Sequence, residues 1–569
     1  MKPKALIVLL LGALCAGSAS AQMGAKPKLV VNIVISQMRA DYMDRFQDNF
    51  SADGFRRFMD QGAYFTDAHY NYMQTNTAAG LATLSTGTNP DGHGIVAEDW
   101  IDFTTNNPVN LIADPSVTGL DCDAGVGCYS PLNLTAATLG DRLKESDAKS
   151  KVVSIAATPV SAIVSGGHTA DVFWMDAGRG HWISSTYYFK QLPTWVTAYN
   201  KQNLFAPFME RSWEPSKTLE GYKNSEHSVI DFTPAKTGFF SKPFFRKVGS
   251  IFKKDDDKFD AAALLYTPFG NSLTTQFARE AIVGEELGKD DHTDLLTIVY
   301  DTPRLIGEHF GPRSIELEDM YYKLDTELGI LTDYLLAQFK PGEVVVVLTS
   351  DHGTSDTYKE DSRVPMGRFN AEQFKMIMNG FLSAQFEPGN WVIDYHDRQL
   401  YLNRSIIYSY GFNLAEVQTR AATFALQFRG VNGALSSTSM QNGYFGGGFG
   451  EKIQNSFYPK RSGDIVINLM PGWIEEDTAK VSLSGSLYDY DTHVPLMFFG
   501  ANIPAQRIGR NVTMTGVTPT LARIMQITVP NASTGSVLPE VVPQQYPEGR
   551  IDRQTDRQTD RQTDRQIYD

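Results

Sequence analysis

Cysteine and long apolar runs are the features this chain has least of. Only three cysteines occur in 569 residues, so a metal site built on thiolates would lack ligands. Beyond the N-terminus, no stretch approaches the about 18 apolar residues that a membrane span needs. Basic residues are outnumbered 51 to 65, giving a formal net charge of −14. This charge argues against nucleic acid or an anionic membrane as the main partner, but a small substrate remains compatible with it.

The N-terminus predicts export. Lys2 and Lys4 precede an apolar segment at residues 5–14, and the small residues 19–21 follow it. This order is typical of a secretory signal peptide, residues 1–21, cleaved after Ala21. Leu14 before Cys15 disfavours lipid attachment, because such sites usually have a small residue there. We therefore expect a periplasmic or secreted protein.

The other two cysteines, Cys122 and Cys128, are separated by five residues that include two glycines. In an oxidising compartment, two cysteines this close in sequence predict a small disulfide loop. The pairing and the predicted export are consistent with each other.

Strand-like and helical patterns alternate along a chain that is 42% hydrophobic and can bury a large core. The alternation predicts a three-layer α/β/α sandwich with a mainly parallel central sheet over residues 22–545. The predicted strands are 29–35, 152–155, 295–300, 344–349, 465–469 and 494–499, and the predicted helices include 55–61, 135–144 and 315–338.

Two long insertions, about 169–260 and 359–485, are expected to cap the C-terminal edge of the sheet, with surface decoration as the alternative. Residues 546–569 contain repeats of an Asp-Arg-Gln-Thr unit. Because this repeat has no apolar face to bury, we expect a disordered tail.

The run 344–353 organises the chain. Its β-branched residues predict a strand buried on both faces, and Asp351, His352 and Gly353 follow at its C-terminal end. Parallel sheets place their chemistry at this edge. A carboxylate beside an imidazole is a candidate metal-binding pair, although a hydrogen-bonded turn is the plainer interpretation of the dipeptide alone.

Five segments in a fixed order resemble the alkaline phosphatase superfamily: 30–42, 75–80 with 85–87, 92–95, 349–353 and 488–495. The likeness is greatest to periplasmic bacterial alkaline phosphatases with a threonine nucleophile and to type I phosphodiesterases/nucleotide pyrophosphatases. The resemblance implies two zinc ions that clamp a phosphoryl group. It implies Thr77 as the nucleophile, Asp351 and His352 as ligands of the nucleophile-side metal, and His493 as a ligand of the other.

This chain departs from the pattern that the resemblance implies. Ser36, Arg304 and Glu308 stand at three of the six expected metal-ligand positions, and a guanidinium cannot ligate zinc. Glu98 stands where a phosphate-binding asparagine is expected. The expected Lys and Arg are also missing, since none occurs at residues 152–178. Zinc should therefore occupy at most one partial site, or none.

Plainer interpretations exist for the individual residues. Thr77 alone could cap a helix, His493 could be a loop histidine, and Arg304 could form an i,i+4 ion pair with Glu308. Arg304 could also take the place of a metal ion, by placing its fixed positive charge near Asp351 and so stabilising the site without zinc.

The sequence thus supports two hypotheses. The first is a pseudophosphatase with weak or no hydrolysis, serving as a binding protein with a protein or envelope partner. The alternative is an active metal-dependent phosphomonoesterase or phosphodiesterase that attacks a small phosphate ester through Thr77.

Overall fold

The computed structural model describes residues 26–226, 261–359, 362–477, 479–500 and 502–542. The predicted signal peptide and the repeat tail lie outside these residues. Among the described helices, none is both long enough and apolar enough to cross a membrane.

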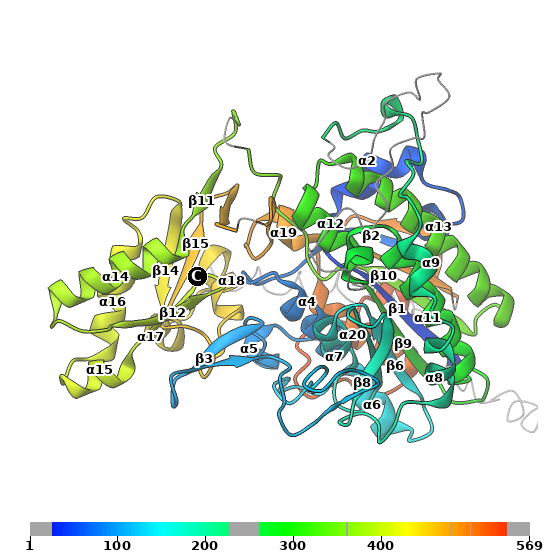
Figure 1. Cartoon of the computed structure of the whole chain (residues 1–569), viewed down its shortest axis with the longest axis horizontal. Coiled ribbons are helices and arrows are strands. Elements are labelled where there is room, and N and C mark those ends of the chain that lie inside the picture. The colour runs from blue at the N-terminus through cyan, green and yellow to red at the C-terminus, as the bar shows by residue number, and fades with distance from the viewer. Residues whose placement is uncertain (1–25, 227–260, 360–361, 478, 501, 543–569) are drawn as a thin grey trace, which may run out of the picture.

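An eleven-stranded sheet forms the centre of the molecule (Figure 1). Its order is β18-β2-β17-β10-β1-β9-β6-β7-β8-β5, and β19 also pairs with β2. The five strands from β10 to β7 are parallel, whereas β17 and β8 join this group antiparallel on either side. The mainly parallel α/β architecture expected from the sequence is confirmed. The strands are β1 (Leu29–Ile35), β2 (Ala63–His69), β5 (Gly119–Leu120), β6 (Val152–Ala156), β7 (Asp171–Asp176), β8 (His181–Ser185), β9 (Asp294–Tyr300), β10 (Val344–Thr349), β17 (His493–Gly500), β18 (Gln506–Ile508) and β19 (Val512–Thr513).

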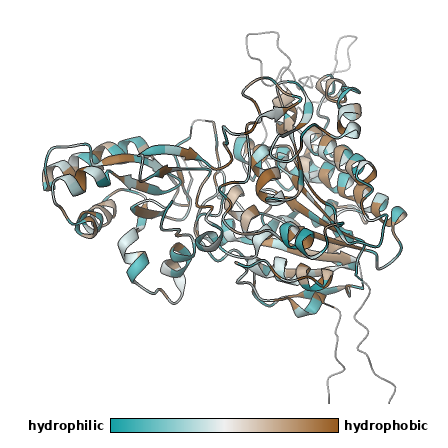
Figure 2. Cartoon of the chain, turned by 90° about the horizontal axis from the view of Figure 1, so that it is seen from below, coloured by the Kyte–Doolittle hydropathy of each residue, from teal (hydrophilic) through white to brown (hydrophobic). Residues whose placement is uncertain are grey.

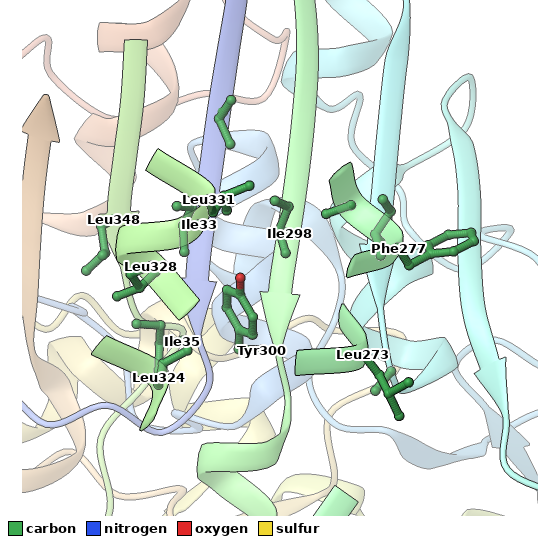
Figure 3. Close-up of a cluster of buried hydrophobic side chains, with 14 of the residues drawn as sticks. Ile33, Ile35, Leu273, Phe277, Ile298, Tyr300, Leu324, Leu328, Leu331 and Leu348 are labelled. Carbon is green, nitrogen blue, oxygen red and sulfur yellow. The ribbon is translucent and has the colours of Figure 1, made fainter. Parts of the chain in front are cut away.

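Both faces of this sheet are buried, because successive side chains of a strand point to opposite faces. Ile33 and Ile35 join one hydrophobic core together with Leu348, and Val30 and Val34 join the other. Figure 3 shows the first core, where side chains of α11 and α13 pack on β1, β9 and β10. Helices α4, α6, α7 and α20 contribute to the second. Strands of the central sheet accordingly appear brown, the colour of hydrophobic residues, in Figure 2.

The helices of the sandwich are α2 (Asp41–Phe46), α3 (Phe55–Gln61), α4 (Thr77–Thr86), α5 (Pro90–His93), α6 (Leu139–Ser146), α7 (Pro159–Gly166), α8 (Thr194–Asn200), α9 (Phe205–Met209), α11 (Phe269–Gly284), α12 (Thr302–Phe310), α13 (Ile315–Gln338), α19 (Asp489–Thr492) and α20 (Val517–Met525). A two-stranded sheet, β3 (Asp99–Asp102) with β4 (Asn107–Asn110), lies at the junction with a second lobe.

The second lobe corresponds to the predicted insertion at 359–485 and has its own hydrophobic core (Figure 1). Its four-stranded sheet has the order β12-β13-β15-β14. The elements of the lobe are β11 (Gly367–Phe369), β12 (Val392–His396), β13 (Gln399–Leu402), β14 (Val431–Ser436), β15 (Ile465–Leu469), β16 (Trp473–Glu475), α14 (Ala371–Gln385), α15 (Arg404–Ser409), α16 (Leu414–Ala425), α17 (Ser437–Asn442) and α18 (Gly448–Asn455).

The first predicted insertion, 169–260, is corrected in part. Strand β7 pairs in parallel with β6 and β8 pairs with β7, so residues 171–185 extend the central sheet instead of capping it. Helices α8 and α9 then pack onto the first core through Val196, Tyr199, Phe205 and Phe208. Residues 227–260 lie outside the described part of the chain.

Candidate active site

A cavity of about 320 Å³ lies where the sandwich meets the second lobe. The N-terminus of α4, helix α12 and the tip of the β12–β13 hairpin supply its walls, together with residues 483–485. The lining residues are Gln74, Asn76, Thr77, Glu98, Asp99, Arg304, Glu308, His396, Asp397, Arg398, Glu475, Lys480, Leu483, Ser484 and Gly485. Most of them are polar or charged, so the cavity suits a charged ligand.

One group of residues, here called the threonine side, consists of Thr77, which lines the cavity, and the fully buried His352, Asp351 and Ser36 behind it. Thr77 begins α4, and its Oγ1 lies 3.1 Å from His352 Nε2. His352 Nδ1 lies 2.6 Å from the Gly353 carbonyl oxygen, which can only accept, so Nδ1 carries the proton. His352 Nε2 therefore accepts a hydrogen bond from the Thr77 hydroxyl. This is the geometry of a hydroxyl beside a base.

Asp351 is fully buried on the threonine side and already has hydrogen-bond donors. Ser36 Oγ donates to Asp351 Oδ2 at 2.7 Å, and the Gln37 amide donates to Oδ1 at 2.9 Å. Gly80 allows α4 to pack directly on this turn, since a Cβ there would come within 2.1 Å of the Asp351 carbonyl oxygen. The local sequence thus fixes the distance between the α4 N-terminus and the end of β10.

A second group, here called the guanidinium side, lines the cavity and consists of Arg304, Glu308, Lys480 and Glu98. Arg304 Nη1 lies 3.5 Å from Glu308 Oε2, and Lys480 Nζ lies 3.0 Å from the same oxygen. The Arg304 side chain is only 15% exposed. Burial alone would lower the pKa of Arg304, but Glu308, Asp301, Glu98 and Asp351 together raise it above its usual value. The arginine is therefore a fixed positive charge among four carboxylates.

The residues of the guanidinium side do not fit a second zinc ion. The expected ligand positions hold Arg304, which has no lone pair to offer, and Glu308, which is paired with two cations. On the threonine side, Asp351 and His352 are the strong donors, and the hydroxyls of Ser36 and Thr77 are weak ones. No third His, Cys, Asp or Glu among the described residues joins Asp351 and His352 within 4.8 Å.

His493 does not line the cavity. It begins β17 opposite His69 of β2, and its Nε2 lies 2.9 Å from the Thr66 carbonyl oxygen. The two imidazole rings stack with centroids 4.5 Å apart. The structure therefore brings together Thr77, Asp351, His352 and Ser36, and separately Glu98, Arg304 and Glu308, but places His493 with β2.

The predicted disulfide is not present. Cys122 and Cys128 are both free, and the Cys122 thiol donates to the Val126 carbonyl oxygen at 3.2 Å. This hydrogen bond closes the glycine-containing loop in place of a covalent link. The backbone at Cys128 is held by the Asp114 amide, which donates to the Cys128 carbonyl oxygen at 2.9 Å.

Sequence reasoning missed the contribution of the second lobe. Asp397 and Arg398 form the two-residue tip of the β12–β13 hairpin, and both have positive φ, 43° and 63°. Arg398 is 4% exposed and donates through Nη1 to the Gly485 carbonyl oxygen. Left-handed backbone is unusual for arginine, and such positions cluster at functional sites. A short His-Asp-Arg turn between two strand patterns was the available signal.

Two carboxyl groups near the hairpin tip have raised pKa values. Asp397 lines the cavity. The surrounding protein removes part of the water from its carboxyl group, and this desolvation raises the pKa to about 7, with the negative charges of Glu475 and Glu98 adding to the effect. Burial raises the pKa of Asp491 to about 6, although hydrogen bonds from the side chain and amide of Ser486 and the charge of Arg398 oppose this shift. Perturbed acids in a cleft are typical of functional sites.

Comparison with known proteins identifies the family. A family model described as type I phosphodiesterase / nucleotide pyrophosphatase matches residues 30–491. The chain belongs to this family. Alkaline phosphatase PafA of Elizabethkingia meningoseptica is 30% identical over 91% of this chain and 95% of that protein. Alkaline phosphatase PhoV of Synechococcus elongatus is 31% identical over 92% and 94%.

The solved structures agree with the sequence comparison. A crystal structure of wild-type PafA superimposes with a TM-score of 0.84 at 30% identity, covering 91% of this chain and 99% of the other. Both the predicted membership of the alkaline phosphatase superfamily and the predicted fold are thereby confirmed. The matched region of the type I phosphodiesterase family model includes Ser36, Thr77, Glu98, Arg304, Glu308, Asp351 and His352.

Proposed function

We propose that this member of the type I phosphodiesterase family is an exported pseudophosphatase. In this proposal the cavity binds a phosphate ester or a related anion, with weak or no hydrolysis. The protein would then act through a protein or envelope partner. Export is inferred from the signal-peptide pattern of residues 1–21.

The observation that carries the proposal is Arg304. Two zinc ions would bring four positive charges, and a dication beside a fixed guanidinium is opposed by Coulomb repulsion as well as by the lack of donors. The ion pairs of Arg304 and Lys480 with Glu308 stabilise the guanidinium side without a metal. Without a metal opposite Thr77, a leaving oxygen would lose its main source of charge stabilisation.

Anion binding is supported by the positive groups around the cavity. Lys480, Arg304 and Arg398 all line it, while the first residue of α4 faces it with the N-terminal end of the helix dipole. These groups offset Glu98 and Asp99 on the same walls. The cavity can therefore hold an anion although the expected cations at residues 152–178 are missing.

The alternative is an active phosphoric ester hydrolase, and the Thr77–His352 hydrogen bond favours it. In that case Thr77 is the nucleophile, His352 and Asp351 hold a single metal, and the cavity takes a phosphate monoester or diester. Because Nδ1 of His352 donates to Gly353, Nε2 would hold that metal, which would supply the activation of the Thr77 hydroxyl. The hydrogen bond itself shows that the two groups lie within reach, and a helix N-terminus beside a buried imidazole also produces it.

Metal content and turnover separate the two functions. Elemental analysis of the purified mature protein should give well under two zinc ions per chain, and hydrolysis of p-nitrophenyl phosphate should stay close to that of Thr77→Ala. Inorganic phosphate should still bind, and Arg398→Gln should weaken that binding. Zinc that Asp351→Asn removes, or robust turnover that Thr77→Ala abolishes, would establish the hydrolase instead.

A further inference from the structure

A second group of potential metal ligands lies outside the cavity, on strands β2 and β17. Asp67 and His69 are two residues apart on β2 and so point to the same face of the sheet, and His493 pairs directly with His69 across the two strands. One ligand atom from each lies within 4.8 Å of the others. In the described part of the chain this is the one group of three His, Cys, Asp or Glu side chains with that spacing.

Hydrogen bonds already orient these side chains. His493 Nε2 donates to the Thr66 carbonyl oxygen at 2.9 Å, so Nδ1 carries the free lone pair. His69 Nε2 lies 2.7 Å from Asp67 Oδ1, while Asn511 Nδ2 donates to Asp67 Oδ2 at 3.2 Å. Metal-binding histidines in proteins typically donate their other nitrogen to a carbonyl or carboxylate, as His493 does here. On metal binding, Asp67 and His69 would exchange their direct contact for bonds to the ion.

We propose that Asp67, His69 and His493 bind a divalent late transition metal, with Zn²⁺ as the first candidate. Two imidazoles and one carboxylate suit Zn²⁺, leaving a fourth position for water. Mg²⁺ and Ca²⁺ are poor candidates because they prefer oxygen ligands. The rings stack 13° from parallel, so side-chain rotation is needed to turn both imidazole lone pairs toward one ion, and the half-buried side chains leave solvent access to it.

The ion would strengthen the support beneath the cavity without entering it. Strand β17 follows α19 directly, and the backbone of α19 accepts hydrogen bonds from the Gly353 and Thr354 amides at 2.7 and 2.8 Å. None of Asp67, His69 and His493 lines the cavity. A metal that joins β2 to β17 therefore restrains the segment that follows His352, and its role is structural.

Zinc titration of the full-length mature protein, followed by calorimetry, tests this site. The wild-type chain should bind one Zn²⁺, and His69→Gln should weaken binding by more than about tenfold, since even loss of an orienting partner typically costs about 10- to 100-fold. His292→Gln is the matched control, because His292 has a single carboxylate partner, Asp147, at 2.6 Å. That variant should bind zinc as the wild type does.

Co²⁺ provides a second measurement that does not depend on stability. Its visible absorption should indicate tetrahedral coordination with nitrogen ligands in the wild-type protein and in Asp351→Asn, but not in His69→Gln or Asp67→Asn. Absence of binding in the wild type, or unchanged binding in His69→Gln, would refute the site. Binding removed by Asp351→Asn would place the ion in the cavity, which refutes this inference and separately counts against the pseudophosphatase proposal.

Discussion

The threonine side and the guanidinium side of the site differ from the two-metal pattern in different ways. The threonine side keeps a hydroxyl hydrogen-bonded to an imidazole, with the Asp351 carboxylate beside them, and Ser36 donates to Asp351 where a further acid is expected. The guanidinium side replaces donors by cations, with Arg304 and Lys480 sharing Glu308. The threonine side has a serine in place of a metal-binding acid, and the guanidinium side has a positive charge in place of a metal ligand.

This difference matters because the two changes have unequal chemical consequences. A serine in place of an acid weakens a metal site but leaves room for an ion. A buried guanidinium among carboxylates repels a dication and also becomes necessary to the fold, since the surrounding acids lose compensation without it. We infer that the guanidinium side, more than the threonine side, prevents this chain from binding a second metal ion.

Arg304→Met should have the largest effect on stability. It leaves Glu308, Asp301 and Glu98 without their shared guanidinium, and removing one partner of a buried pair typically costs about 3–5 kcal/mol. Urea unfolding measures this loss. Arg313→Met is the control, because Arg313 is 52% exposed and pairs with Asp356 at the surface, so a loss under about 1 kcal/mol is expected. Equal losses in the two variants would mean that Arg304 has no special role.

Restoring the ligands should rebuild the metal site. The triple variant Ser36→Asp, Arg304→Asp and Glu308→His should raise zinc affinity by more than about 100-fold, because each change adds a direct ligand. Elemental analysis after dialysis measures this change. Addition of Glu98→Asn should then allow p-nitrophenyl phosphate hydrolysis, although turnover should remain weak without the missing Lys and Arg. Unchanged zinc content in the triple variant would indicate that Arg304 is not what excludes the metal.

The sequence predicted the central sheet and the end of its strand β10 well. Runs such as 29–35 and 344–349 contain enough β-branched residues to predict doubly buried strands, and Asp351 and His352 follow the strand they were expected to follow. The suggestion that Arg304 places its fixed charge near Asp351 stays a prediction, although the Asp351 charge is among those that raise the pKa of Arg304. Local pattern was sufficient at these positions.

The positions of several residues at or near the cavity depend on tertiary contacts, which the local sequence pattern does not reveal. The cations at the cavity come from Arg398 and Lys480, which are more than 300 residues from Thr77 in sequence, and only the docking of the second lobe brings them there. The side-chain direction of His493 depends on strand pairing with His69, which no motif specifies. Proximity of Cys122 and Cys128 in sequence likewise did not produce the expected disulfide.

Anion binding should depend on pH through Asp397. Its carboxyl, with a pKa of about 7, is neutral below that pH and adds a negative charge above it. Binding of bis(p-nitrophenyl) phosphate, whose charge is constant in this range, should weaken by about fivefold as the pH rises through 7, equivalent to about 1 kcal/mol. Calorimetry between pH 6 and 8 measures this step.

Asp397→Asn is the matched variant, because asparagine accepts the positive φ at this turn and carries no charge. It should bind the diester without the pH step. The free energy of unfolding should also fall as the pH rises. A carboxyl whose pKa is raised in the folded state stabilises the fold below its unfolded pKa, and this contribution is lost as the pH rises through 7. A pH step that persists in Asp397→Asn would point to another acid, such as Glu98.

The threonine side should give the smallest effect. Thr77→Val removes the hydroxyl at nearly constant volume and leaves His352 Nε2 without its donor, which should cost about 1 kcal/mol of folding stability. Thr77→Ser retains the hydroxyl and should recover most of that loss. Because stability and hydrolysis are measured separately, the pair also distinguishes structure from chemistry. In a pseudophosphatase the two variants differ in urea midpoint but not in p-nitrophenyl phosphate turnover, whereas a nucleophilic Thr77 would make turnover fall in Thr77→Val and persist in Thr77→Ser.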